Sequence, residues 1–263
     1  MADERERGVL LEVAYDGTAF HGWAAQSGAR TVQETLRGAV LAMDPRASEV
    51  RGASRTDAGV HAEGQAVAFD SSREIAARGW VGGLNQHLPA DVVVRAARPV
   101  PAGYTPRYAA RAKRYRYRVL VDSVRDPQWR TRAWRVEPNL DLAAMAREAD
   151  AAVGTHDFAG FRAAGDPRAE TVRTLMRVDL ERELDARVVA VVVEGNAFLY
   201  KMVRVLVGTL VDVARGRLAP GAVRRALEAR NRREAGTTAP AHGLVLESVD
   251  LAMPEAVGER WPS

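Results

Sequence analysis

Cysteine is absent from this chain of 263 residues, and lysine is nearly absent. Without cysteine the protein has no disulfides, thiolate zinc sites, iron–sulfur ligation or cysteine nucleophile, which fits a reducing compartment. The 38 basic residues are arginines apart from Lys113 and Lys201. This bias is explained equally well by codon usage and by an anionic partner, because guanidinium groups suit phosphate and RNA.

Long apolar runs are absent as well. No stretch reaches the roughly 18 uninterrupted apolar residues of a membrane span, and residues 1–7 are charged and contain no apolar signal core. We therefore expect a soluble, cytoplasmic protein with no membrane contact. An apolar content of 47% suffices for a sizeable core in one large or two modest domains.

Motifs for metal and serine chemistry are also absent. His61 and Glu63 form the H-x-E pattern of zinc nucleobase deaminases, but those enzymes also need a P-C-x-x-C half-site. No G-x-S-x-G nucleophile elbow occurs. The sequence predicts no metal site, because no helical ligand pair is formed by the other histidines, which are His21, His87, His156 and His242.

Hydrophobic periodicity predicts a β-α-β-β-α-β order in the first part of the chain. Thr31 and Glu34 form a capping box before apolar positions with helical spacing. Pro99, Pro101 and Pro106 mark a boundary near residue 106. The predicted strands are 9–15, 48–54, 64–70 and 91–98, and the predicted helices are 32–43 and 73–87.

The second part of the chain shows a similar order. An α+β fold follows, in which two similar ferredoxin-like halves share an extended antiparallel sheet with an active-site cleft between them. We assign residues 1–106 to an N-terminal domain and residues 107–263 to a C-terminal domain. The predicted strands here are 112–121, 172–182 and 187–195, and the predicted helices are 140–153, 198–215 and 220–229.

The segment R-T-D-A-G-V-H, residues 55–61, lies between two predicted strands. Its single carboxylate, Asp57, precedes Gly59 and allows two interpretations. One is a turn in which the aspartate bonds its own backbone. The other is a catalytic acid displayed on a loop between rigid strands. The spacing alone does not choose between them.

The segment A-K-R-Y-R-Y-R-V-L-V, residues 112–121, alternates with period two. Its tyrosines would be half buried beside a solvated arginine face, or they would form a platform for a base beside arginines that contact phosphates. One face carries Lys113, Tyr115 and Tyr117, and the other carries Arg114, Arg116 and Arg118.

Arg204 lies within the apolar helix predicted at 198–215. A buried guanidinium needs a partner, either a structural carboxylate or a ligand anion, unless its stem carries it to the surface. Tyr200, Arg204 and Gly208 share one helix face, where the glycine would let another backbone approach closely.

These segments resemble blocks of the tRNA pseudouridine synthase A family. The most specific block is S-R-T-D-A-G-V-H-A-E-G-Q-A-V-A-F, residues 54–69. In this sequence Ser54 replaces a frequent glycine, and Ala24 and Ala25 replace polar or basic residues, which affects the grip on RNA rather than the reaction. The resemblance spans nearly the whole chain, because further blocks follow in family order at 15–23, 31–36, 84–92, 110–119, 156–162, 196–210 and 242–249.

The resemblance implies isomerisation of uridine to pseudouridine at positions 38, 39 and 40 in the anticodon stem-loop of tRNAs. It also implies a homodimer that uses no metal and no organic cofactor. Asp57 would be the catalytic acid, Arg204 would pair with it, and Tyr115 would be the active-site tyrosine. The other substrate-binding residues would be Arg55, Arg114 and Arg116.

Enclosing Asp57 with a flat uracil would raise the pKa of its carboxyl group, whereas an arginine within about 4 to 6 Å would lower that pKa by roughly 1 to 3. We therefore expect Arg204 to keep the acid charged, with Gly59 and Gly208 permitting a close approach of loop and helix. The alternatives are a tRNA-binding module or chaperone without catalysis, and a different RNA-modifying enzyme.

Overall fold

The computed structural model describes residues 7–166 and 168–253, and the chain divides into two compact units. Unit 1 runs to Arg111 and resumes at Leu246, and unit 2 comprises Ala112–Val245. The chain therefore changes units inside strand β5 (Ala110–Val121) and again inside strand β10 (Leu244–Leu251). The predicted domain boundary at residue 106 lies just before the first change, and the division into domains 1–106 and 107–263 stays a prediction.

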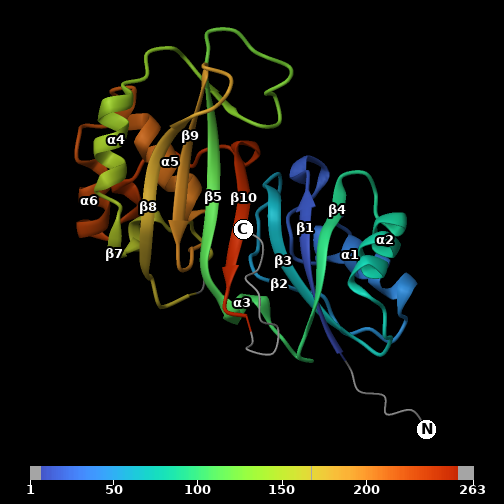
Figure 1. Ribbon diagram of the computed structural model, residues 1–263. Helices are drawn as coiled ribbons and strands as arrows, with labels where there is room; N and C mark the ends of the chain where they lie inside the picture. Colours follow the sequence, from blue (N-terminus) through green and yellow to red (C-terminus); the bar gives the residue numbers. More distant parts are fainter. Residues whose placement is uncertain (1–6, 167, 254–263) are drawn as a thin grey trace. The chain divides into compact units, whose positions relative to one another are not determined.

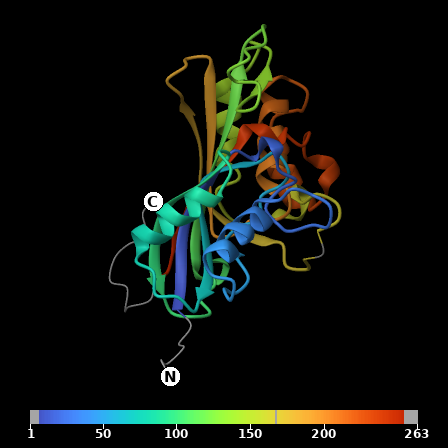
Figure 2. The same cartoon turned by 90° about the vertical axis from the view of Figure 1, so that its right-hand side faces the viewer.

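Unit 1 contains the predicted β-α-β-β-α-β order (Figure 1). Its strands follow the order β4-β1-β3-β10, and the short β2 also pairs with β3. Strand β1 is antiparallel to both β3 and β4. In Figure 2, α1 and α2 lie in front of these strands. The elements are β1 (Arg7–Tyr15), α1 (Val32–Met43), β2 (Arg51–Gly52), β3 (His61–Ser71), α2 (Ala77–His87), β4 (Val92–Val100) and α3 (Pro106–Ala109).

The N-terminus of α1 has the predicted cap. The Thr31 hydroxyl accepts a hydrogen bond from the Glu34 backbone N–H at 3.4 Å. The apolar positions at helical spacing are buried against the unit 1 core, and they are Val32, Leu36, Ala39 and Val40. Capping and burial of one face therefore begin and hold this helix where the sequence predicts it.

Helix α2 begins at Ala77 rather than at the predicted residue 73. The backbone N–H of Ser72 donates to the Asp44 carboxylate at 3.0 Å, and that of Arg73 donates to the Ser71 hydroxyl at 3.0 Å. These side chains hold the preceding segment outside the helix. Residues 1–6, whose charges entered the prediction of location, lie outside the described part of the chain.

Unit 2 has strands in the order β5-β9-β8-β7, all antiparallel neighbours, with β6 parallel to the end of β5. Helix α4 packs on α5 and on β8, and α6 packs on both helices. The further elements are β6 (Trp134–Val136), α4 (Leu142–Asp150), β7 (Gly154–Asp157), β8 (Val172–Arg182), β9 (Val188–Gly195), α5 (Met202–Ala214) and α6 (Ala222–Ala229).

The α+β class is confirmed, and the strand order recurs. In both units the first strand pairs with a later strand, β3 or β9, and that strand also pairs with the one just before it in the sequence, which is the two-residue β2 in unit 1 and β8 in unit 2. The prediction missed β6, β7 and β10. The active-site cleft between the halves stays a prediction. Among the described residues, no helix combines the length and apolar character that crossing a bilayer requires.

Candidate active site

Asp57 lies in the loop 53–60 that joins β2 to β3. Its side chain is partly exposed, and the neighbouring Arg55 is exposed. The Asp57 backbone carbonyl accepts a hydrogen bond from the Val60 N–H at 3.1 Å, and Gly59 has a φ of 78°. The loop therefore closes as a tight turn whose left-handed residue is a glycine, as favoured at such positions.

A preceding segment, residues 15–23, holds this loop through the backbone. The Trp23 N–H donates to the Thr56 carbonyl at 3.0 Å, and the Gly59 N–H donates to the Phe20 carbonyl at 3.3 Å. In addition, the hydroxyl groups of Tyr15 and Thr56 are hydrogen-bonded at 2.8 Å in a buried position. The residues on both sides of Asp57 are thus fixed, while Asp57 itself is partly exposed.

Two glycines allow this segment to lie directly against the loop. A Cβ atom at Gly17 would come within 2.0 Å of the Val60 carbonyl oxygen. A Cβ atom at Gly22, whose φ is 92°, would come within 2.8 Å of the Thr56 carbonyl oxygen. The segment Y-D-G-T-A-F-H-G-W, which the sequence presented only as a block of resemblance, therefore also supports loop 53–60.

The H-x-E histidine has a structural role. His61 is 3% exposed, and its Nδ1 accepts a hydrogen bond from the Gly17 N–H at 3.1 Å. The same nitrogen lies 3.2 Å from the Asp16 carboxylate. On the other side of the loop, the Gln65 side chain bonds both the N–H and the carbonyl of Ser54, at 3.1 and 2.7 Å. Because these are backbone bonds, a serine in place of glycine at 54 leaves them intact.

In unit 2 the tyrosine face of β5 is buried. Tyr115 is 6% exposed and Tyr117 is fully buried. The Tyr115 ring lies edge-to-face with Phe198, with 5.1 Å between the ring centroids and an interplanar angle of 84°. The Tyr117 hydroxyl donates to the Pro240 carbonyl at 2.8 Å. The predicted alternation is confirmed, and the aromatic face belongs to the core side of this strand.

The arginine face of β5 carries ion pairs with the neighbouring strands. Arg114 lies 3.2 Å from Glu194 of β9. Arg116 lies 2.8 Å from Glu181 and 3.2 Å from Glu183, and its side chain is only 16% exposed. The positive charges of Arg114 and Arg116 are therefore balanced by carboxylates as well as by solvent. A role of Arg114 and Arg116 in binding the substrate stays a prediction.

Arg204 is partly exposed on α5 and is tied to the segment that precedes β10. Its Nε donates to the Ala239 carbonyl at 2.8 Å, and the Ala239 N–H donates to the Arg204 carbonyl at 3.0 Å. Burial raises the pKa of Tyr117 far above its usual value, and the Arg204 charge acts in the opposite direction. Burial lowers the pKa of His242. A hydrogen bond with the Ala133 backbone raises this pKa, and the Arg204 charge lowers it further. The Arg204 charge thus lowers the pKa of both the Tyr117 hydroxyl and the His242 ring.

Gly208 permits a close backbone approach, as the sequence predicts, but with a partner that the sequence analysis did not foresee. A Cβ atom at this position would lie 1.7 Å from the Thr237 carbonyl oxygen. The glycine therefore accommodates the segment 237–239 within unit 2. This corrects the expectation that Gly208 serves the approach of the Asp57 loop.

Asp166 was missed by the sequence analysis, although it organises the residues before α5. Its side chain is 1% exposed, accepts from the Arg168 Nε at 2.8 Å and accepts from the Tyr200 N–H at 2.8 Å. Arg168 in turn donates to the Phe198 carbonyl at 2.8 Å. Because Lys201 then takes a left-handed φ of 58°, α5 begins at Met202 and not at 198. This pair therefore supports the ring that packs on Tyr115.

Comparison with known proteins identifies the family. A family model described as tRNA pseudouridine synthase matches residues 12–109 and 149–250. The chain belongs to this family. The predicted resemblance is thereby confirmed, and the chain is an enzyme of the isomerase class. Both the Asp57 loop and Arg204 lie within the matched residues.

Relatives called tRNA pseudouridine synthase A match nearly end to end. The protein of Acetivibrio thermocellus is 40% identical over 243 residues, which cover 92% of this chain and 99% of the relative. The protein of Citrifermentans bemidjiense is 41% identical, over 92% of this chain and 97% of the relative. That of Halalkalibacterium halodurans is 44% identical, over 89% of both chains.

Proposed function

We propose that this enzyme converts uridine to pseudouridine at positions 38, 39 and 40 of the tRNA anticodon stem-loop, with Asp57 as the catalytic acid. The observation that carries the proposal is that hydrogen bonds fix loop 53–60 on both sides of Asp57. Backbone bonds and the Tyr15–Thr56 contact fix the residues around Asp57, whereas Asp57 itself is partly exposed. A preorganised group on a rigid scaffold is what catalysis of a precise bond exchange requires.

The reaction needs one carboxylate and no redox partner. The bond from C1′ to N1 breaks, the detached uracil turns and C5 joins C1′; C5 then loses its proton to water and N1 gains one, so the product is an isomer of the substrate. Asp57 acts either as a nucleophile at C1′ or C6 or as a base that removes a sugar proton. Each route needs the carboxylate in its ionised form when the base arrives.

Arg204 and Tyr115 complete the proposed site. A guanidinium beside Asp57 would favour the ionised carboxylate when uracil encloses it. The target nucleotide has to leave its stem, at a cost of a few kcal/mol, and Tyr115 would hold the extruded base. The support for this is that both residues occupy organised positions, on β5 and α5. Assembly as a homodimer and a cytoplasmic location belong to the same proposal.

The test uses tRNA transcripts tritiated at uracil C5, each with one uridine among positions 38, 39 and 40. We expect the wild type to release tritium to water from each transcript, and Asp57→Asn to release none above background. The matched control is Asp250→Asn, because Asp250 is an exposed acid of the same unit. We expect this control to retain wild-type release.

Other results would decide against the proposal. Binding of tRNA without tritium release by the wild type would indicate the non-catalytic module. A reaction that needs an added donor would indicate a different RNA-modifying enzyme. Full activity of Asp57→Asn would remove Asp57 from the chemistry.

A further inference from the structure

The loop 122–133, which joins β5 to β6, is longer than most connections in compact domains, where about 4 to 6 residues are typical. It lies beyond the upper end of β5 in Figure 1. It is also basic, with Arg125, Arg130 and Arg132. Loops of this length usually carry a function or lack order.

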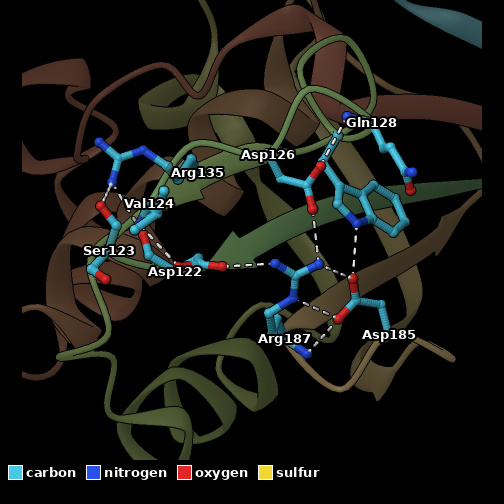
Figure 3. A network of polar contacts seen from close by, with 9 residues as sticks. Asp122, Ser123, Val124, Asp126, Gln128, Arg135, Asp185 and Arg187 are labelled. Atoms are coloured by element: carbon cyan, nitrogen blue, oxygen red, sulfur yellow. Dashed lines mark hydrogen bonds and ion pairs between the residues drawn. The ribbon is translucent and has the colours of Figure 1, made fainter.

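This loop is anchored by Arg187, which follows the turn between β8 and β9 (Figure 3). The guanidinium lies 2.8 Å from Asp122, 2.8 Å from Asp126 and 2.7 Å from Asp185. Hydrogen bonds with Asp185 first, and then with the two loop aspartates, raise the pKa of Arg187. Both aspartates of the loop are therefore paired with one arginine of the same unit.

Trp129 is the second anchor. Its Nε1 donates to the Asp185 carboxylate at 2.9 Å. Its ring packs against the buried cluster of Leu120, Ala133 and Val188. The aspartates also cap the turns of the loop, because Asp122 accepts from the Val124 N–H and Asp126 accepts from the Gln128 N–H, each at 2.9 Å. The loop is thus ordered before any partner binds, which removes part of the entropy cost of binding.

Two arginines of this loop face solvent. Arg125 and Arg130 are exposed, and across residues 7–166 and 168–253 neither takes part in an ion pair. Val124, which lies between Asp122 and Arg125 in the loop, is 68% exposed. Loop 122–133 carries three arginines against two aspartates, a net charge of +1, and both of these aspartates are paired with Arg187 while Arg125 and Arg130 are exposed.

We propose that loop 122–133 is a contact surface for the sugar–phosphate backbone of tRNA, with Arg125 and Arg130 binding phosphates. Guanidinium groups bind phosphate oxygens through paired, charge-assisted hydrogen bonds. Contacts of this kind set position and orientation without reading sequence. The inference rests on the proposed function, since it takes tRNA as the substrate.

The test compares Arg125→Gln/Arg130→Gln with Arg147→Gln/Arg224→Gln. The second pair is the matched control, because Arg147 and Arg224 are exposed on α4 and α6 of the same unit and the change in charge is equal. Dissociation constants for an unmodified tRNA transcript are measured by fluorescence anisotropy at several salt concentrations. We expect the loop variant to bind about tenfold more weakly and the control to bind within twofold of the wild type.

The salt dependence gives an independent readout. Each phosphate contact adds about 0.9 to the slope of log affinity against log salt, so we expect the loop variant to lose roughly 1.8. Tritium release at saturating tRNA should stay at the wild-type rate. Affinity and slope equal to those of the wild type would overturn the inference, and so would a changed oligomeric state in sedimentation, which would assign the loop to a protein contact. Absence of tritium release from the wild type would instead overturn the proposed function.

Discussion

The acid loop of unit 1 and the arginine–tyrosine region of unit 2 are held by different kinds of contact. Loop 53–60 is bound mainly through backbone groups, and glycines let the supporting segment lie against it. In unit 2, side chains make the decisive bonds, such as Arg204 to the Ala239 carbonyl and Tyr117 to the Pro240 carbonyl. The conformation of loop 53–60 should therefore tolerate changes of side chain at positions such as Ser54. In unit 2, by contrast, the bonds to the Ala239 and Pro240 carbonyls require the side chains of Arg204 and Tyr117.

The largest expected effect concerns Arg204. Replacing it with methionine removes both the charge proposed to act on Asp57 and the donor to the Ala239 carbonyl. We expect kcat for tritium release to fall roughly 100-fold, the size typical of losing one electrostatic contact to a reacting group. Arg224→Met is the control, because Arg224 is an exposed arginine of the same unit. Wild-type kcat in Arg204→Met would separate this arginine from the chemistry.

The next effect concerns stability in unit 2. Gly208→Ala would place a Cβ atom 1.7 Å from the Thr237 carbonyl oxygen, so α5 or the 237–239 segment has to move. We expect a loss of about 1 to 3 kcal/mol in the free energy of unfolding, measured in urea. Gly38→Ala on α1 is the control, since its Cβ would have open space. That change should be neutral or stabilising by up to about 1 kcal/mol. Equal effects of the two changes would contradict the close approach.

An effect on stability of similar size is expected at Asp166. The hydrogen bond from Arg168 lowers the pKa of this carboxyl well below its ordinary value of 3.8. A carboxyl group whose pKa is lowered by folding stabilises the folded state at pH values above 3.8. This stabilisation is lost as the pH falls toward and through the pKa of the folded state. Asp166→Asn should therefore lower the free energy of unfolding by about 1 to 3 kcal/mol at pH 7.

The pH dependence distinguishes this role from a packing defect. The difference between wild type and Asp166→Asn should shrink as unfolding is measured at pH values progressively below 3.8. Asp150→Asn, at an exposed position of α4, should show no comparable difference. A difference that stays constant down to acid pH would show that the ion pair with Arg168 contributes nothing.

The sequence could predict the features that depend on neighbours along the chain. The Thr31 cap and the apolar spacing of α1 were sufficient because a helix forms from local contacts. The placement of Asp57 between two strands also followed from local turn residues and the resemblance. The alternation in β5 separated buried tyrosines from arginines in the right register.

The features that depend on distant partners could not be predicted. Gly208 signalled a close approach, but only the fold shows that Thr237 is what approaches. Asp166 carries no local signal, because its role comes from bonds to the Tyr200 N–H and to Arg168 across a turn. Strand β10 was missed since its pairing partners lie far away in the sequence. These contacts join segments that no periodic pattern links.

The smallest expected effect concerns the buried bond between the hydroxyl groups of Tyr15 and Thr56, one of the side-chain bonds that support loop 53–60. Tyr15→Phe removes the buried hydroxyl contact to Thr56, at 2.8 Å, while the backbone bonds of Thr56 and Gly59 remain. Combined with Thr56→Val in a double-mutant cycle, it should give a coupling energy of about 0.5 to 1.5 kcal/mol in urea unfolding. Turnover should change only severalfold, because the backbone still holds the residues on both sides of Asp57. A loss of activity as large as that expected for Arg204→Met would mean that this hydroxyl pair, and not the backbone, positions the loop.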